Sequence, residues 1–545
     1  MIANFQCSFQ VKRQLYDSAN GLILQADFSY GFDGCGSVRV YDGPTYNGKD
    51  IVHGNIIYGG MFLSRIRLQE SGQVVFKVPH MASSRNERPI LLVDGKEHSK
   101  TLDEIFDSFN KEHPEAHKKP VKLDFDGDKQ LVINLNLKCS QMDGKCIKLA
   151  QGRLGAYCLM CSRSREECHD PEVVAAGMNV DLSTEEINAT WEKFKERVKK
   201  KEEQKEASGS GDSTTEDEED DIDWKINTKK IDVNVRSGQT HQPKTMTIEI
   251  CNIMPPLHCK LRAYDWCLDM MLRFSSGRNK WMERNVGLKK KYEKFKDHYR
   301  NNSKRILGFG IFKMKGDTGI TANDFFKHKN RENVLKLLDL HAPPLPDYEI
   351  QEEVEQFEKR MDQIERFKNH WRQVIQNICV IVRILNSDEL VNLEAYEAFC
   401  IKTYLLIVTG GGNKDFAYPK IWLFPTVHEF LGHSIDVIKD NGGRGLLNQS
   451  EQPGEASHKE VQFLRERAAR KIGQQENFED VFNQLWIASD FTIRSFDRVH
   501  TCSYCKVEGH HVKSCPHRNP QKEGDPDDAI IATLTYPENV EDKVD

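Results

Sequence analysis

Two incomplete sets of zinc ligands lie in distant parts of the chain. Cys158 and Cys161 form a C-x2-C pair in "AYCLMCSRS", and His428 and His433 form an H-x4-H pair in "TVHEFLGHS". A structural zinc ion takes four nitrogen or sulfur ligands in a tetrahedron, so each pair supplies half of a site. If one ion holds both pairs, the fold must bring these segments together. The spacing alone leaves open the alternative of a buried cysteine pair and two unrelated histidines.

The histidine pair does not have the spacing of a metalloprotease. That motif places its two histidines four positions apart on one helical face, with a glutamate between them. His428 and His433 are five positions apart. On a continuous helix this spacing turns the second ring away from the first by about 140°. We therefore exclude a catalytic zinc site of that class.

A second and complete set of ligands lies near the end of the chain. Cysteines and a histidine in "TCSYCKVEGHHVKSCP" follow the pattern C-x2-C-x4-H-x4-C. This is the spacing of a zinc knuckle, a small module that binds nucleic acid. The sequence therefore predicts a second zinc ion and a nucleic-acid partner. Its ligands would be Cys502, Cys505, His510 and Cys515.

Length and composition indicate an intracellular protein of several domains. The chain has 545 residues, of which 38% are hydrophobic and 29% charged. It has no apolar run near the ~20 residues that span a bilayer, and its first residues do not resemble a secretory signal. Its 15 cysteines are an odd number. Cysteines of a chain without an export signal are expected to stay reduced and to serve metal binding or core packing.

Charge is unevenly distributed along the chain. The net charge is −6, but the block Glu216 to Asp223 alone carries seven negative charges. The stretch from Arg278 to Arg305 has eleven Lys and Arg against three Asp and Glu. Such a basic stretch is either a phosphate-contacting surface or the solvated face of a helix. A second basic stretch covers residues 459 to 471.

Composition and patterning divide the chain into seven segments. Strand-like runs separated by Gly and Asp-Gly turns dominate the beginning, and helical spacing dominates the middle. The segments are a mixed α/β region (1–150), the C-x2-C segment with a charged helix (151–205), an acidic linker expected to be disordered (206–244), a helical region (245–410), a region with the histidine pair (411–500), the knuckle (501–520) and a tail expected to be disordered (521–545).

Three carboxylates occupy positions that suit phosphoryl transfer. Asp33 and Asp143 each follow a predicted strand, and Glu455 lies at the start of a long basic helix. A two-metal site needs carboxylates on adjacent strand ends and on a facing helix, holding two Mg²⁺ over the scissile phosphate. Each Asp-Gly pair alone is more often a turn. The three residues are therefore a hypothesis that depends on the fold.

Taken in order, these motifs resemble a known family. Asp33, Asp143 and the C-x2-C pair are followed far downstream by the histidine pair and Glu455. This arrangement is similar to the catalytic core of the V(D)J recombinase catalytic subunit and its relatives, the Transib transposases. The resemblance covers about residues 20 to 500, and it is strong at both ends and weak in the helical middle. The Gly509-His510 form of the knuckle resembles that of the lancelet ProtoRAG branch.

The resemblance implies a fold and an activity. It implies an α/β RNase H-like core with a large helical insertion, a zinc ion bound by Cys158, Cys161, His428 and His433, and a C-terminal knuckle. It also implies a DDE triad of Asp33, Asp143 and Glu455 that binds two Mg²⁺ or Mn²⁺. Such an enzyme nicks DNA beside terminal inverted repeats. It then uses the freed 3′-hydroxyl to form a hairpin or to join the element to a target.

The resemblance also implies partners and a location. These are DNA, a homodimer, a second subunit of the recombinase type, and the nucleus. Family members carry a DNA-end-binding and dimerisation region ahead of the first catalytic aspartate, whereas 32 residues precede Asp33 here. We therefore expect that region to be absent from this chain. The residues expected to contact DNA are Lys289, Lys290, Lys291, Lys459, Arg465 and Arg467.

Two alternatives remain at this stage. In the first, the chain binds nucleic acid through its knuckle and catalyses nothing. In the second, it is a domesticated or truncated copy that keeps the fold without transposing. The DNA sequence that it would recognise and the need for a second subunit do not follow from the residues.

Overall fold

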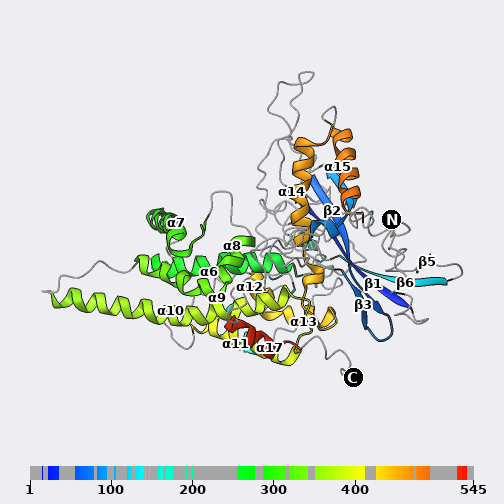
Figure 1. The fold of residues 1–545 in the computed structure, drawn as a ribbon. Helices are drawn as coiled ribbons and strands as arrows, with labels where there is room; N and C mark the ends of the chain where they lie inside the picture. Colours follow the sequence, from blue (N-terminus) through cyan, green and yellow to red (C-terminus); the bar gives the residue numbers. More distant parts are fainter. Residues whose placement is uncertain are drawn as a thin grey trace, which may run out of the picture.

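The computed structural model describes a sheet region, a helical body and a short C-terminal helix (Figure 1). The described residues are 23–35, 56–78, 83–94, 120–125, 129–139, 167–175, 254–276, 286–312, 319–341, 350–410, 425–470, 474–490 and 525–536, with isolated positions between 15 and 203, among them 142, 158, 160, 161 and 163. The predicted acidic linker (206–244) and the knuckle lie outside them.

The described strands form one mixed sheet in the order β3-β2-β1-β6-β5, with β4 also paired to β2. β1 and β2 are antiparallel, whereas β1 and β6 run parallel. The last pair in the parallel ladder joins Tyr30 to Cys139. The strands are β1 (Leu24–Cys35), β2 (Ile56–Leu68), β3 (Val74–Lys77), β4 (Arg88–Asp94), β5 (Val121–Phe125) and β6 (Lys129–Cys139).

β1 has one apolar and one polar face, as the two-residue period of a strand requires. Leu24, Ala26 and Phe28 join a hydrophobic cluster with residues of β2, β5 and β6. Asp27 and Ser29 alternate with them and are also buried, with 5% and 3% of their surface exposed. Buried polar side chains need partners. Asp27 accepts hydrogen bonds from Arg65 of β2 and Asn136 of β6, within the sheet. Ser29 donates to the carbonyl of Asn448, far along the chain, so the polar face of β1 is also an interface.

Two glycines inside β2 mark close approaches rather than a turn. A Cβ atom at Gly59 would lie 2.9 Å from Cβ of Leu91, and one at Gly60 would lie 2.3 Å from the carboxyl carbon of Glu87. A side chain at either position would collide with the strand or side chain beside it. The pairing of β2 with β4 also changes register between these glycines. A Gly-Gly pair that suggests a turn in the sequence is therefore accommodated within a long strand.

The helical body packs around large aromatic side chains. Trp266 of α6 and Trp371 of α10 are almost fully buried, and their rings lie 5.4 Å apart. The last two turns of α10, from Ile378 to Leu385, are apolar and buried apart from Arg383, which makes this the central helix of the body. The helices and 3-10 turn are α6 (Pro256–Ser276), α7 (Val286–Leu307), α8 (Gly319–Phe326), α9 (His328–Leu335), η7 (Lys336–His341), α10 (Gln351–Leu385), α11 (Leu393–Val408), α12 (Pro425–Gly432) and α13 (Ser434–Asp440).

A helical pair stands against β2 on the side away from most of the helical body (Figure 1). It consists of α14 (Gln452–Arg467) and α15 (Gln474–Ala488). Val461 of α14 and Val481 of α15 form an apolar cluster with Ile56 and Tyr58 of β2. The first turn of α14 therefore lies at the junction of the sheet and the helical body.

The C-terminal tail is partly folded, which corrects the prediction that residues 521–545 are disordered. Helix α17 (Pro526–Leu534) packs against α10 and α11. Asp525 caps its first turn by accepting a hydrogen bond from the N–H of Asp527. The next residues pair with the strand-like segment after α10, through a bridge between Val391 and Thr535. The apolar run "AIIATL" and this cap explain why the segment folds.

The buried carboxylate of Asp527 fixes α17 in place. Its two oxygens accept hydrogen bonds from Arg331 at 2.5 Å and from Gln376 at 3.0 Å. His328, Asp525 and Asp527 lie close enough together to hold a metal ion. However, both oxygens of Asp527 already have partners, and Arg331 brings a positive charge to the place an ion would take. We interpret this group as an ion pair.

No helix among the described residues is both long and apolar enough to cross a membrane.

Candidate zinc centre and carboxylate site

The structure brings Cys158, Cys161, His428 and His433 together in the interior. Their ligand atoms all lie within 4.8 Å of one another, and all four residues are buried. His428 Nε2 lies 3.2 Å from Cys161 Sγ and 3.3 Å from His433 Nε2. A tetrahedral zinc ion with Zn–N bonds of about 2.0–2.1 Å separates two nitrogen ligands by about 3.3 Å. The donor types, burial and separations therefore fit one zinc ion.

A helix boundary allows the two histidines to converge. α12 ends at Gly432, and His433 lies between this helix and α13. On a single straight helix the two rings would point in different directions. With the break after Gly432, the rings lie 5.0 Å apart at a right angle. The spacing of five residues thus argues against a protease helix but not against a shared metal ion.

Tyr404 of α11 orients His428 through Nδ1, the ring nitrogen that faces away from the other three ligands. The Tyr404 hydroxyl donates a hydrogen bond to the carbonyl of Cys168 at 2.5 Å and lies 2.7 Å from His428 Nδ1. Because the hydroxyl proton goes to the carbonyl, the tyrosine oxygen accepts from Nδ1–H. This arrangement leaves the Nε2 lone pair of His428 directed toward the other ligands. Such partners fix the tautomer and orientation of metal-binding histidines.

Electrostatics favours the ligand forms of His428 and Cys161, whereas burial raises the pKa of Cys158. Burial lowers the pKa of His428, so its ring is neutral, as a metal ligand must be. Hydrogen bonds from Cys158 and Cys168 lower the pKa of Cys161 and favour its thiolate. The segments 158–161 and 425–440 are thereby linked through one polar centre inside the helical body.

Glu455 lies in the first turn of α14 and is accessible. Its side chain is 39% exposed. Its carboxylate oxygens lie 3.9 Å from His258 Nε2 and 3.6 Å from His458 Nδ1. A partly exposed carboxylate beside two imidazoles can bind a cation or face a phosphate. This accessibility distinguishes it from the other two acidic residues that surround the start of α14.

Glu451 joins the start of α14 to the start of α6. One of its carboxylate oxygens accepts hydrogen bonds from the backbone N–H of His258 at 2.7 Å and from His258 Nδ1 at 2.8 Å. The side chain of Glu451 is 6% exposed. A carboxylate at the N-terminus of a helix is stabilised by the helix dipole and the free N–H groups there. This contact fixes α14 relative to the helical body.

Glu87 joins α14 to the sheet. Its carboxylate accepts hydrogen bonds from Ser457 Oγ at 2.7 Å and from Tyr58 Oη at 3.2 Å. The residue is 2% exposed, and the room for it is provided by Gly60. Burial raises the pKa of Glu87 to about 7, although both hydrogen bonds act in the opposite direction. The carboxyl group thus titrates near neutral pH within a packed interface.

The raised pKa of Glu87 predicts a pH-dependent stability. The folded state holds the proton more tightly than the unfolded state, so this contribution is complete below about pH 4.5 and is lost as pH rises to about 7. Glu87→Gln keeps the acceptor oxygen and removes the titration. Its free energy of unfolding should match the wild type at pH 4 and exceed it by about 3 kcal/mol at pH 8. Urea denaturation at both values measures this, and a difference independent of pH would contradict it.

The other predicted residues fall into two groups. The backbone of Asp33 belongs to β1 and pairs with Tyr58 of β2. Its side chain lies outside the described part of the structure, as do Asp143, the four knuckle ligands Cys502, Cys505, His510 and Cys515, and the side chains of Lys289 and Lys291. Lys290, Lys459 and Arg467 are exposed, as a phosphate contact requires.

Arg465 is not placed to contact DNA, which corrects the prediction. It is 3% exposed, and its Nε donates to Asn477 Oδ1 at 3.2 Å. Its guanidinium lies over the ring of Phe478, 4.9 Å from the ring centre. α14 packs against α15 on the face that carries Arg465. Arg465, although it belongs to the basic stretch 459–471, is therefore part of the interface between these two helices.

Several neighbours of these sites were not predicted. Tyr404, His258 and Glu87 come from segments far from the residues they contact, and no spacing in the sequence connects them. Glu451 is different, because it lies one helical turn before Glu455, where an i, i+4 pair would share a face. This i, i+4 spacing is the one feature of the sequence that indicates a neighbour of Glu455.

No known family model matches the chain, and no curated protein resembles it closely enough in sequence to count as a match.

Proposed function

We propose that the chain is the catalytic subunit of a DDE-type DNA recombinase or transposase with an RNase H-like core. It would nick DNA at terminal inverted repeats and use the 3′-hydroxyl for hairpin formation or strand transfer. Asp33, Asp143 and Glu455 would hold two Mg²⁺, which when bound would stabilise the attacking and leaving oxygens.

The contact between Tyr58 and α14 is the observation that carries this proposal. Tyr58 is paired directly with Asp33, and its ring contacts that of His458 at 6.0 Å. Directly paired residues of neighbouring strands point to the same face of a sheet. The backbone of Asp33 is therefore in register with a residue whose ring contacts α14. His458 lies three residues after Glu455, in the same part of that helix.

The parallel pairing of β1 and β6 supports the place of Asp143. Asp33 follows Tyr30 by three residues, and Asp143 follows Cys139 by four. Because parallel strands end at the same edge of a sheet, the proposal assigns both aspartates to one edge, facing Glu455. The described sheet order supports an RNase H-like arrangement, in which the first acidic strand lies beside the second.

The proposed zinc ion has a structural role. Cys158, Cys161, His428 and His433 would hold it, and it would join the segment after Asp143 to α12 and α13. From Ser434 the chain continues through α13 toward α14 and Glu455. A second zinc is assigned to the predicted knuckle. Both ions would organise the chain rather than take part in the reaction.

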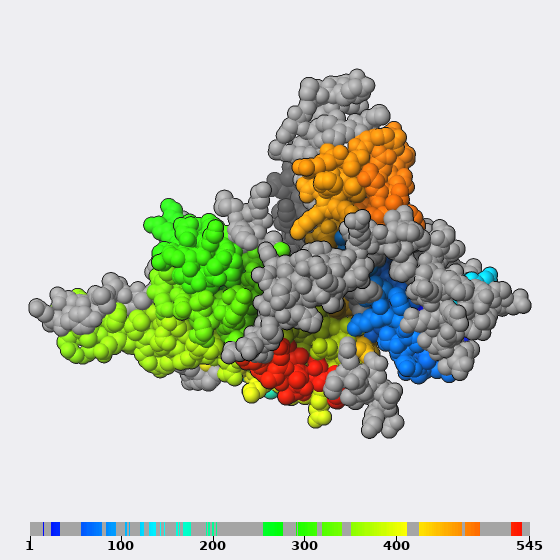
Figure 2. Space-filling model, in the orientation of Figure 1, coloured from blue at the N-terminus to red at the C-terminus, as the bar shows by residue number. Residues whose placement is uncertain are grey.

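DNA contact is assigned to the exposed basic residues. Lys290 lies on α7, and Lys459 and Arg467 lie on α14. In Figure 2, α7 (green) and the α14–α15 pair (orange) rise from the same side of the molecule. Lys289 and Lys291 belong to this proposal through their sequence positions. A homodimer, a recombinase-type second subunit and a nuclear location are proposed from the resemblance alone.

The test is metal-dependent nicking of DNA that carries inverted-repeat ends. The wild type should nick with Mg²⁺ or Mn²⁺, and Asp33→Asn should not. DNA binding without nicking by the wild type, unchanged by substitution of the three acidic residues, would favour the non-catalytic alternative. Activity that survives Asp33→Asn would exclude the assigned triad.

A further inference from the structure

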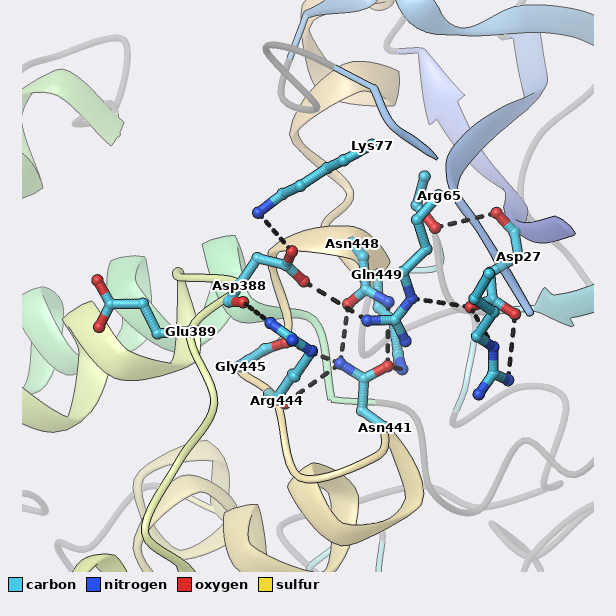
Figure 3. A network of polar contacts seen from close by, with 12 residues as sticks. Asp27, Arg65, Lys77, Asp388, Glu389, Asn441, Arg444, Gly445, Asn448 and Gln449 are labelled. Carbon is cyan, nitrogen blue, oxygen red and sulfur yellow. Dashed lines mark hydrogen bonds and ion pairs between the residues drawn. The ribbon is translucent and has the colours of Figure 1, made fainter. Parts of the chain in front are cut away.

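The segment from Asn441 to Glu451 connects the zinc-binding helices to the helix that carries Glu455. It follows α13 directly and leads into α14. Asn448, Gln449, Ser450 and Glu451 are all buried, although all are polar. A buried polar loop costs free energy unless its groups are hydrogen-bonded. The geometry of this segment therefore depends on specific side-chain contacts (Figure 3).

Asn441 provides most of these contacts. Its Nδ2 donates to the Gly445 carbonyl at 2.7 Å and to Asn448 Oδ1 at 2.9 Å. Its Oδ1 accepts from Asn448 Nδ2 at 3.0 Å and from Gln449 Nε2 at 2.7 Å. With both amide protons and both lone pairs used, one 3%-exposed side chain fixes the path of the loop. Gly445 has no space for a side chain, since a Cβ would lie 2.4 Å from two carbonyl oxygens.

The organised loop is bound to the strand that carries Asp33. Ser29 Oγ donates to the Asn448 carbonyl at 2.6 Å. Ser29 and Asp33 are four positions apart on β1, an even spacing, and residues at even spacing share a face of a strand. The loop therefore joins the face of β1 that the proposed site uses to the start of α14.

A chain of charged residues, buried at Asp27, Arg65 and Asp388, also joins the sheet to this loop. Arg65 of β2 donates to Asp27 of β1 at 2.8 Å, and its guanidinium lies 3.9 Å from Asp388. Asp388 also contacts Lys77 of β3 at 2.7 Å, and its backbone carbonyl accepts from Arg444 at 3.0 Å. Figure 3 shows these residues converging from the sheet and the helical body. Together these contacts fix the position of the segment Asn441 to Glu451 relative to the sheet.

We propose that Asn441 is a positioning residue for Glu455. Through Asn448 and Gln449 it sets the entry of α14 relative to β1, and so the distance from the Glu455 carboxylate to the two aspartates. This inference rests on the proposed function, because it concerns the geometry of that metal site. Asn441 itself would contact neither metal nor DNA.

The test measures metal dependence rather than activity alone. Asn441→Ala should raise the Mg²⁺ concentration for half-maximal nicking by about 10-fold, a typical effect of losing a residue that supports metal ligands. Mn²⁺, which tolerates less ideal geometry, should restore most of the rate. Asn441→Asp keeps the acceptor contacts but places a carboxylate oxygen against the two acceptors that Nδ2 served, so it should shift the Mg²⁺ dependence at least as far as Asn441→Ala.

Asn477→Ala is the matched control. Asn477 is also 3% exposed and also organises α14, but at its C-terminal end, where it donates to the Arg470 carbonyl at 2.9 Å. It should lose comparable thermal stability with no change in metal dependence. Equal metal dependence of Asn441→Ala and the wild type would overturn the inference and leave the proposed function intact. A wild type that neither nicks nor binds Mn²⁺ would overturn both.

Discussion

Replacement of Glu455 by glutamine is expected to lower Mg²⁺-dependent nicking by roughly 100- to 1000-fold, while DNA binding stays unchanged. The neutral amide keeps the size of the side chain and one acceptor oxygen but provides no negative charge for a metal ion. The side chain is partly exposed and lies beside two histidines, His258 and His458. Its removal should therefore affect the site much more than the fold.

Glu460→Gln is the control for this experiment. Glu460 lies on the same helix, five residues further along, and has no proposed ligand role. It should nick at the wild-type rate. Nicking kinetics at saturating DNA, together with a binding measurement and a thermal melt, separate a lost ligand from a damaged protein. Equal loss of nicking in both variants would contradict the assignment of Glu455.

Loss of the proposed zinc ion is expected to lower the unfolding temperature by about 10 °C or more. Structural zinc sites contribute many kcal/mol, since the ligands converge only in the folded chain. Cys161→Ser should release one zinc equivalent from the purified protein and expose a buried cluster of polar groups. Metal analysis and thermal unfolding in the presence and absence of a chelator measure both effects. A stable variant with unchanged zinc content would contradict the site.

Two further variants make the zinc experiment specific. Tyr404→Phe retains all four ligands but removes the acceptor for His428 Nδ1–H, so zinc affinity should fall about 10- to 100-fold. Cys267→Ser changes another fully buried cysteine of the helical body, outside the cluster. It should keep the full zinc content. A zinc loss in Cys267→Ser would indicate general unfolding rather than loss of a ligand.

Local sequence patterns predict the strands and helices well, but they do not predict which distant segments come into contact. The strand character of residues near Asp33 and before Asp143, the helical middle and the two half-sets of zinc ligands all follow from periodicity and spacing. The meeting of the half-sets required a fold, because nothing in "YCLMC" specifies a partner. The break after Gly432 shows why, since a spacing argument assumes a straight helix.

The errors have physical causes as well. Arg465 looked like one member of a basic surface, but α15 covers that side of α14. The sequence of residues 525–536 suggests a polar tail because it contains acidic residues without local partners. The partners of Asp527 are Arg331 of α9 and Gln376 of α10, which lie far away in the sequence. Asn441 and Glu87 are ordinary polar residues in the sequence. Their importance arises from burial, which composition cannot assign to individual positions.

The docking of α17 turns the predicted knuckle from a tail into a bridge. The 34 residues from 491 to 524, which include its four ligands, are attached to the folded body at both ends. Asp490 is bonded to Arg88 at 3.2 Å, and α17 is fixed through Asp527. Even fully extended, such a segment keeps every point within about 60 Å of the nearer attachment. DNA bound by the knuckle would thus be held near the folded body at a millimolar effective concentration. The knuckle and the body would then bind DNA bivalently, and the second contact would be intramolecular.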